Sequence, residues 1–213
     1  MAARKKARGK KVVRTSKGER TAQRILDAAE GAFADKGFDA ASLREIAGLA
    51  EVHEPGVYRY FESKQALYAA VLDRALQPML DAMQRFQQAG AEASASESLP
   101  GVMTDILLEH PQMAALFQQA LQGEGASAGG RILRQWLDRL FGQAVETLEA
   151  LGYGGRDRAD LAIHVIAMFN LTTGYFLSQR ALAAMTEGRI TDPEHIDRQK
   201  ALLDRLVRGS LGD

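Results

Sequence analysis

The chain contains 213 residues, of which 46% are hydrophobic and 25% are charged, and it contains no cysteine. This length allows one large domain or two small ones with a real core, and the composition excludes a wholly disordered chain. The absence of cysteine excludes disulfide scaffolds, thiolate metal sites and cysteine nucleophiles.

The formal net charge of zero hides an asymmetry along the chain. Residues 1–64 carry 14 Lys or Arg against 9 Asp or Glu, whereas residues 65–213 carry 13 against 18. A basic end on an acidic body indicates that one part faces a polyanion, although a solvated tail that aids solubility is an equally good interpretation. Residues 1–17 contain almost no large apolar side chain, and we expect them to form a disordered basic arm.

Three helices are expected next. The apolar residues follow helical spacing from about residue 19, and Gly37 is a good C-terminal stop. A second helix runs from about Ser42, which can cap it, to residue 50. A short third helix begins near Pro55, which is allowed in a first turn, and carries residues 57–61.

The rest of the chain also has helical spacing with short breaks. Ser63 can cap a long fourth helix, and we expect a kink at Pro78 inside it. Residues 89–98 are small and polar and should form a loop. Further helices are expected at about residues 99–109, 111–122, 130–151, 156–187 and 192–209. No convincing strand or long repeat is found, so the sequence predicts an all-α protein of about nine helices.

Residues 38–64 contain two short helices separated by a tight turn, which is the arrangement of a helix-turn-helix. Apolar packing against the helix that begins near residue 19 would fix one of the two short helices as a brace. The outer face of the other, which carries residues 54–60, would then be free to enter a DNA major groove. Tyrosine hydroxyls can donate to phosphate, and Arg59 can reach phosphate or guanine. On these grounds we expect DNA contacts from Ser42, Glu54, Pro55, Gly56, Tyr58, Arg59, Tyr60 and Lys64. The alternative is that the spacing and the tyrosines serve only a small helical core.

Residues 38–72 closely resemble the signature of the tetracycline-repressor-like (TetR/AcrR) family of transcriptional regulators. The matching positions are Ser42, Arg44, Ile46, Ala47, Val52, Val57, Tyr58, Arg59, Tyr60, Phe61, Lys64 and Leu67. With the first helix, the resemblance covers about 50 residues; the rest of the chain matches only in length and helical character.

The resemblance implies a role for each matching head residue. Phosphate contacts are implied at Ser42, Tyr58 and Lys64, and base or mixed contacts at Arg44, Glu54, Pro55, Arg59 and Tyr60. Two positions depart from the family. Glu51 stands where the family commonly has glycine, at a cost of up to about 1 kcal/mol in a left-handed turn, so we expect the turn to close differently. Glu54 cannot favour phosphate; it can accept from cytosine, but we favour pairing with Arg59 or Arg44.

The resemblance also implies two parts that follow the basic arm (residues 1–17) expected from composition: a three-helix DNA-binding domain (residues 18–64) and a larger ligand-binding and dimerisation domain (residues 65–213). A homodimer formed through helices at about 156–187 and 192–211 would bind a near-palindromic operator in double-stranded DNA. Candidate interface residues are Leu161, Val165, Phe169, Phe176, Leu202, Leu203, Leu206 and Val207, although some of them must belong to the intramolecular core.

A small-molecule effector is expected to bind the larger domain. Candidate pocket residues are Met83, Phe86, Met103, Leu107, Phe117, Trp136 and Met168; at helical spacing such residues are also typical of plain core. Polar groups that can orient a ligand are His164, Asn170, Thr172, Thr173 and Tyr175. Binding would move the recognition helices off the major-groove repeat of about 34–36 Å and release the operator, as a repressor requires.

Competing classes have less support. No nucleophile elbow, phosphate loop or zinc-protease motif occurs, and the four histidines are scattered, so we expect no enzymatic activity, metal or cofactor. No apolar run approaches the roughly 20 residues of a membrane span, and the basic N-terminus lacks a signal-peptide stretch, so we expect a cytoplasmic protein without a membrane partner. A non-specific nucleoid or RNA binder remains the main alternative.

Overall fold

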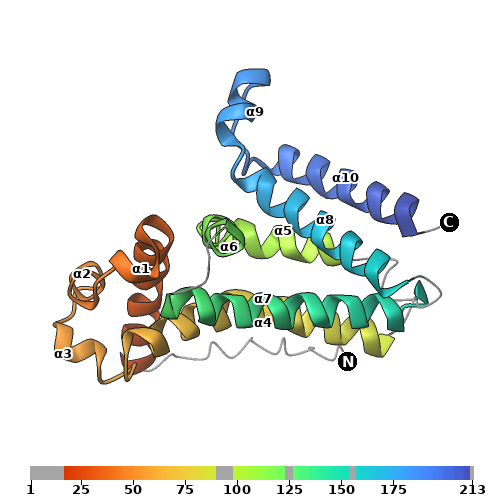
Figure 1. The fold of residues 1–213 in the computed structure, drawn as a ribbon. Helices are drawn as coiled ribbons and strands as arrows, with labels where there is room; N and C mark the ends of the chain where they lie inside the picture. Colours follow the sequence, from red (N-terminus) through yellow and green to blue (C-terminus); the bar gives the residue numbers. More distant parts are fainter. Residues whose placement is uncertain (1–16, 90–97, 123–126, 154–156, 212–213) are drawn as a thin grey trace, which may run out of the picture.

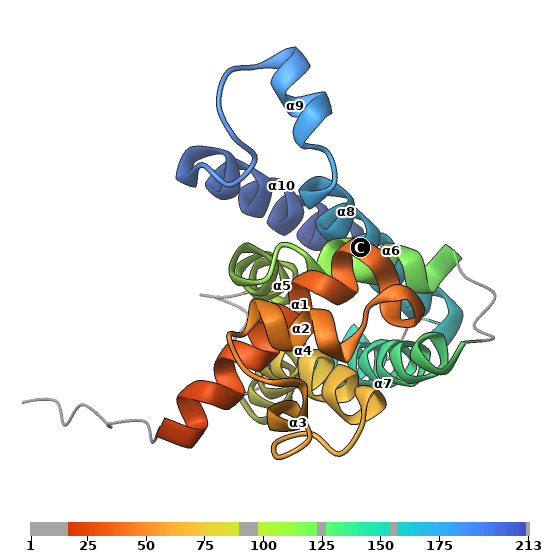
Figure 2. The ribbon, with the colours of Figure 1, turned by 90° about the vertical axis from the view of Figure 1, so that its left-hand side faces the viewer.

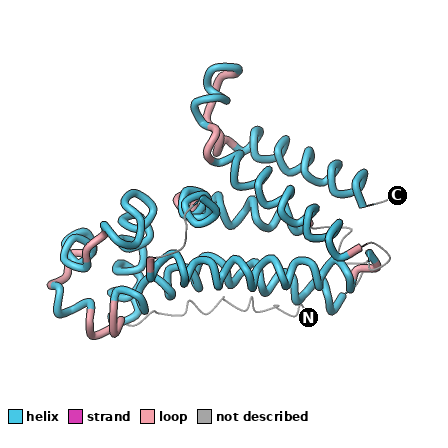
Figure 3. The backbone as a smooth tube through the Cα atoms, in the orientation of Figure 1, coloured by secondary structure: helices cyan, strands magenta, loops and turns pink. Residues whose placement is uncertain are grey.

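The computed structural model describes residues 17–89, 98–122, 127–153 and 157–211. These residues form ten helices and no strand, which confirms the predicted all-α class (Figures 1 and 3). The predicted basic arm, up to residue 16, and most of the predicted loop at 89–98 lie outside the described residues. The helices are α1 (Lys17–Ala40), α2 (Leu43–Leu49), α3 (Glu54–Val57), α4 (Lys64–Ala89), α5 (Leu99–Glu109), α6 (Met113–Gln122), α7 (Ala128–Ala150), α8 (Arg158–Phe176), α9 (Gln179–Met185) and α10 (Pro193–Leu211).

The single helix predicted at residues 156–187 is wrong, because the chain breaks between α8 and α9. The amides of Leu177 and Ser178 donate to carbonyls three residues back, at 3.2 and 2.9 Å, which tightens and ends the last turn of α8. The two helices are bent by 69° at this break. Among the described helices, none alone has the length and apolar character to cross a membrane; α8 and α9 pass that test only as a bent pair.

Local signals placed most helix ends correctly. The amide of Glu45 donates to the Ser42 hydroxyl and the amide of Ala66 donates to the Ser63 hydroxyl, each at 3.1 Å, as expected for two N-caps. Gly37 interrupts α1 with a φ of 74°, as its predicted stop requires. The third helix is shorter than predicted: the amides of Tyr60 and Phe61 both donate to the Val57 carbonyl, and the chain continues as turns. α4 continues through Pro78.

The helices form a head at one end and a layered body (Figures 1 and 2). We call α1–α3 the head and α4–α10 the body. The long helices α4 and α7 pack along each other, α5 and α6 lie between them and the layer of α8 and α10, and α9 stands away from the rest of the body.

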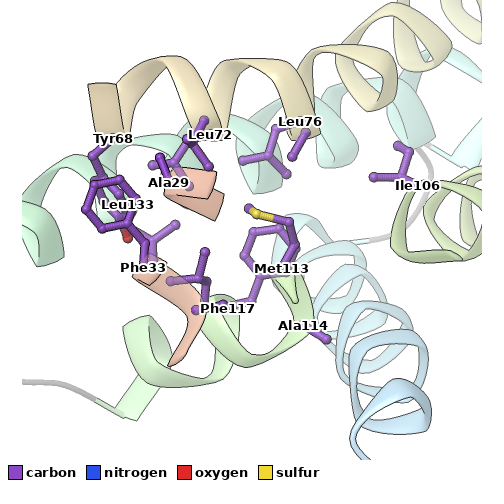
Figure 4. Packing of buried hydrophobic residues seen from close by; sticks show 14 of the residues in the cluster. Ala29, Phe33, Tyr68, Leu72, Leu76, Ile106, Met113, Ala114, Phe117 and Leu133 are labelled. Carbon is purple, nitrogen blue, oxygen red and sulfur yellow. The ribbon is translucent and has the colours of Figure 1, made fainter. Parts of the chain in front are cut away.

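The head and the body share one core. Figure 4 shows Phe33 of α1 between Tyr68 of α4, Phe117 of α6 and Leu133 of α7. The side chains of Phe33 and Phe117 are completely buried, and buried residues from α1 to α8 belong to one continuous cluster. A division of the chain at residue 64 therefore stays a prediction, since no gap in the packing marks it.

Candidate nucleic-acid interface

Packing on α1 orients the two short helices of the head. Ile25 and Phe33 on α1, Ile46 on α2 and Val57 on α3 all have no exposed surface. Burying each of these side chains contributes about 1.5–3 kcal/mol, so their apolar spacing sets which faces point inward. α2 thus acts as the predicted brace, and the remaining face of α3 points to solvent.

Glu51 shows how the turn between α2 and α3 is closed. Its φ is 52°, in the left-handed region where glycine is usual. Its amide donates to the Gly48 carbonyl at 3.1 Å, and the Val52 amide donates to the Ala47 carbonyl at 2.9 Å. These two bonds are the Schellman pattern that ends a helix at a left-handed residue. The expectation of a different closure is wrong, because glutamate keeps the left-handed conformation and satisfies the helix carbonyls.

The residues expected at DNA belong to α2, α3 and their flanks: Ser42 and Arg44 lie at the start of α2, residues 54–56 lie on α3, residues 58–60 form the turn after it, and Lys64 begins α4. The side chains of Tyr58 and Tyr60 are 52% and 37% exposed. Ser42, Arg44, Glu54, Pro55 and Arg59 are also exposed, whereas Gly56 and Lys64 are half-buried. The edge formed by α2, α3 and the turn after α3 lies at the end of the molecule remote from α9 and α10 (Figure 1).

The charged groups on this edge differ from expectation in two places. Within the described part of the chain, Glu54 makes no ion pair, so the pairing that we favoured with Arg59 or Arg44 is absent. Both guanidiniums consequently face solvent without a carboxylate partner among those residues. Lys64 donates to the Asp39 carbonyl at 3.1 Å, and its ammonium lies 4.6 Å from the centre of the Phe38 ring, so these contacts join the start of α4 to the end of α1.

A cavity of about 670 Å³ lies between α4, α5, α7, α8 and α10. Four of the predicted pocket residues line it: Met83, Phe86, Met103 and Met168. Leu107, Phe117 and Trp136 do not; Leu107 and Phe117 are instead fully buried in the core. Sequence reasoning did not separate the two sets because both have apolar helical spacing. Further lining residues that it missed include Ser98, Asp105, Leu148, Tyr153, Lys200 and Arg208.

The polar groups expected to orient a ligand divide in the same way. His164 and Thr172 line the cavity. The His164 Nδ1 atom lies 2.7 Å from the Asp160 carbonyl, so it carries a proton and leaves Nε2 for another partner. Asn170 and Thr173 bond within α8, and the Tyr175 hydroxyl donates to the Ile190 carbonyl.

An apolar face on α8 and α10 is left uncovered in the single chain. Of the residues predicted at a dimer interface, Leu202 and Leu206 are 47% and 39% exposed, whereas Leu161, Phe169 and Leu203 are buried inside the chain. The exposed positions on α8 are different from those predicted: Ile163, Ile166 and Leu171.

Comparison with known proteins gives consistent matches. Residues 25–71 match the family model described as bacterial regulatory proteins of the tetR family. The transcriptional regulator RutR of Escherichia coli K12 is 34% identical over 93 residues, which cover 44% of each chain. The transcriptional repressor NicS of Pseudomonas putida is 29% identical over 146 residues, 68% of this chain and 67% of NicS. The chain thus matches less than half the length of RutR.

Solved structures extend the similarity to the body. A TetR-like regulator from Rhodococcus sp. RHA1 has a TM-score of 0.61 and 25% identity, covering 94% of this chain and all of that one. The regulator FadR of Bacillus subtilis, solved in complex with stearoyl-CoA, has a TM-score of 0.62 and 17% identity, covering 88% and 98% of the two chains. The second match shows the fold alone.

Proposed function

We propose that this chain is a TetR-family protein and acts as a ligand-responsive transcriptional regulator, most simply a repressor. It binds a near-palindromic operator as a homodimer and leaves it when an effector fills the cavity between α4, α5, α7, α8 and α10. The observation that carries this proposal is the exposed edge formed by α2, α3 and the turn after α3, where Tyr58 and Tyr60 flank Arg59 in the chain and no described carboxylate pairs with Arg44 or Arg59.

The chemistry of this edge suits a duplex. Tyrosine hydroxyls and the Ser42 end of α2 would bind phosphates, which fix the register of the protein but carry no sequence information. Arg59 would reach a guanine edge in the major groove, where a good bidentate pair is worth about 1–3 kcal/mol of discrimination. The unpaired Glu54 carboxylate would accept from cytosine N4, the role left once the arginine pairing is absent.

A second copy of the chain would cover the apolar face of α8 and α10. One short recognition helix reads only a few base pairs, and a twofold dimer doubles the site. Six apolar side chains are exposed on these elements: Ile163, Ile166 and Leu171 on α8, Leu177 directly after α8, and Leu202 and Leu206 on α10. Their burial is the driving force that we propose for dimerisation.

The effector would be a molecule with a large apolar part. Four methionine and three phenylalanine side chains are among the residues that line the cavity, and methionine adapts readily to an irregular ligand. At about 670 Å³ the cavity lies within the roughly 300–1,000 Å³ of drug-sized sites. The complex of Bacillus subtilis FadR with stearoyl-CoA supports testing acyl chains first.

Selection of bound sites from random duplex DNA tests the proposal. We expect two half-sites related by a dyad, with centres about one helical turn apart or a multiple of it. Tyr58→Phe should weaken binding to all sequences about equally, whereas Arg59→Ala should change the preferred base as well. Arg180→Ala, which removes another exposed arginine at the far end of the molecule, is the control. If no site is enriched over bulk DNA, the chain is a non-specific binder; if neither head variant alters affinity, the turn after α3 does not contact DNA.

The basic segment before Glu19 would add affinity that is independent of sequence. Nine of the first twenty residues are basic, so phosphate neutralisation should steepen the salt dependence of binding. Deletion of residues 1–17 should flatten the plot of log affinity against log salt concentration. An unchanged slope would contradict a role for this segment at DNA.

A further inference from the structure

A polar cluster centred on the buried Glu30 joins the head to the body, away from both the DNA-facing edge and the cavity lining. It contains Asp27 and Glu30 on α1, Arg74 on α4, and His110, which is the corner residue between α5 and α6. The four residues come from three segments that are far apart in the sequence. Neither the DNA contacts nor the cavity described above uses any of them.

The contacts of Glu30 are close and fill both of its carboxylate oxygens. The Arg74 Nη2 atom donates to Oε2 at 2.5 Å, and His110 Nδ1 lies 3.1 Å from Oε1 and 3.0 Å from Oε2. Arg74 Nη1 donates to Asp27 at 2.6 Å, so one guanidinium holds two carboxylates on successive turns of α1. Charge-assisted contacts of this kind are short and directional.

The environment of Glu30 makes these partners obligatory. The residue is only 3% exposed. Burial raises the pKa of its carboxyl, but the hydrogen bond and charge of His110, followed by those of Arg74, outweigh burial and hold that pKa below its ordinary value. Glu30 is therefore an ionised group inside the protein, and moving His110 away would leave a buried charge poorly compensated.

His110 is also connected to the cavity. Its amide donates to the Ile106 carbonyl at 2.8 Å, and its carbonyl accepts from the Met113 amide at 3.0 Å, so it is fixed to both α5 and α6. Met103, which lines the cavity, lies on α5 seven residues before His110, a distance of about 10 Å along the helix. A shift of α5 that makes room for a ligand would carry His110 with it.

We propose that Glu30, Arg74 and His110 form a polar tie that positions the head on the body, and that His110 is the member through which movement of α5 reaches α1. This inference deepens the proposed function and rests on it. Apolar contacts alone would allow these helices to slide against each other. The Glu30 carboxylate, with contacts on both of its oxygens, allows only one relative position of α1, Arg74 and His110. Arg74 keeps α1 on α4, and His110 adds the dependence on α5.

The distance between head and body tests the tie without a known ligand or operator. The chain has no cysteine, so spin labels at Leu49→Cys on α2 and Glu146→Cys on α7 would be the only ones. Both positions are exposed, and dilution with unlabelled chain isolates the distance within one copy. In this background His110→Leu should broaden the distance distribution, and His110→Gln, which can still donate to Glu30, should restore it.

DNA binding by the same variants supplies the second measurement. If loss of the tie leaves about one tenth of the molecules with a competent head, affinity for the selected operator falls about tenfold in His110→Leu. His195→Leu is the control, because this histidine lies in the first turn of α10 and its ring contacts the Arg189 carbonyl at 2.8 Å, outside the cluster around Glu30.

The two measurements separate the possible failures. An unchanged distance distribution in His110→Leu overturns the tie, whatever its affinity for DNA. A broadened distribution that His110→Gln does not restore also overturns it, because the effect would then come from general loosening. Failure of the proposed function would appear differently: the distribution would broaden as expected while no operator is bound by the parent protein.

Discussion

Substitution of Gly129 by alanine should push α7 away from the head. A Cβ atom at this position would lie 2.2 Å from Cβ and 2.3 Å from Cγ of Phe38. The Phe38 ring is held in turn by Phe33 and Tyr68, with ring centres 6.0 and 5.2 Å away. Rotation of the Phe38 side chain cannot move its own Cβ, so the backbones of α1 and α7 must separate.

The expected loss of stability follows from two opposing effects. Overfilling a packed contact costs about 1–3 kcal/mol. Replacing a helical glycine with alanine gains up to about 1 kcal/mol, and less in a first turn. Gly129→Ala should therefore lower the free energy of unfolding by about 1–2 kcal/mol, a fall of roughly 2–8 °C in Tm for a chain of this size.

Gly142→Ala is the matched control, because it makes the same change on the same helix at a position where no atom outside the adjacent helix backbone lies within 4 Å of the added Cβ. It should raise Tm by up to roughly 4 °C. Both variants are compared at one protein concentration, since a dimer's Tm depends on it. Fluorescence of Trp136, the single tryptophan, reports on α7 directly. Equal Tm values for the two variants would refute the close packing of α7 on Phe38.

Three further predictions follow from the described contacts. Glu51→Gly should be about 1 kcal/mol more stable in chemical denaturation than Glu51→Ala, because both lose the Arg24 ion pair and only glycine adopts a positive φ freely; equal stability would contradict the left-handed turn. The contribution of Glu30 to stability is complete above about pH 4.5 and is lost as the pH falls through its lowered folded-state pKa, so Glu30→Gln should reduce the pH dependence of Tm in acid. Ile166→Asp should convert a dimer to a monomer in sedimentation, whereas Leu108→Asp, on an exposed site of α5, should not; a dimeric Ile166→Asp would place the interface elsewhere.

The sequence alone determined the features that depend on neighbouring residues. Ser42 and Ser63 cap helices because a hydroxyl next to a free amide is a local arrangement, and Gly37 stops α1 for an equally local reason. The apolar spacing of the head required its outer edge to be polar and exposed, and the contiguous motif at residues 38–72 carried the family resemblance. The break after Phe176 had no strong local signal, and it was missed.

Tertiary structure decided everything that depends on residues distant in the chain. Met168 lines the cavity and Phe117 lies in the core, although both have apolar helical spacing. The neighbouring helices that pack against a helix face decide whether its side chains line a cavity or are buried in the core. Glu30 and His110 are separated by 80 residues, and no periodicity relates them. Their pairing exists because the fold buries a charge that three helices together must compensate.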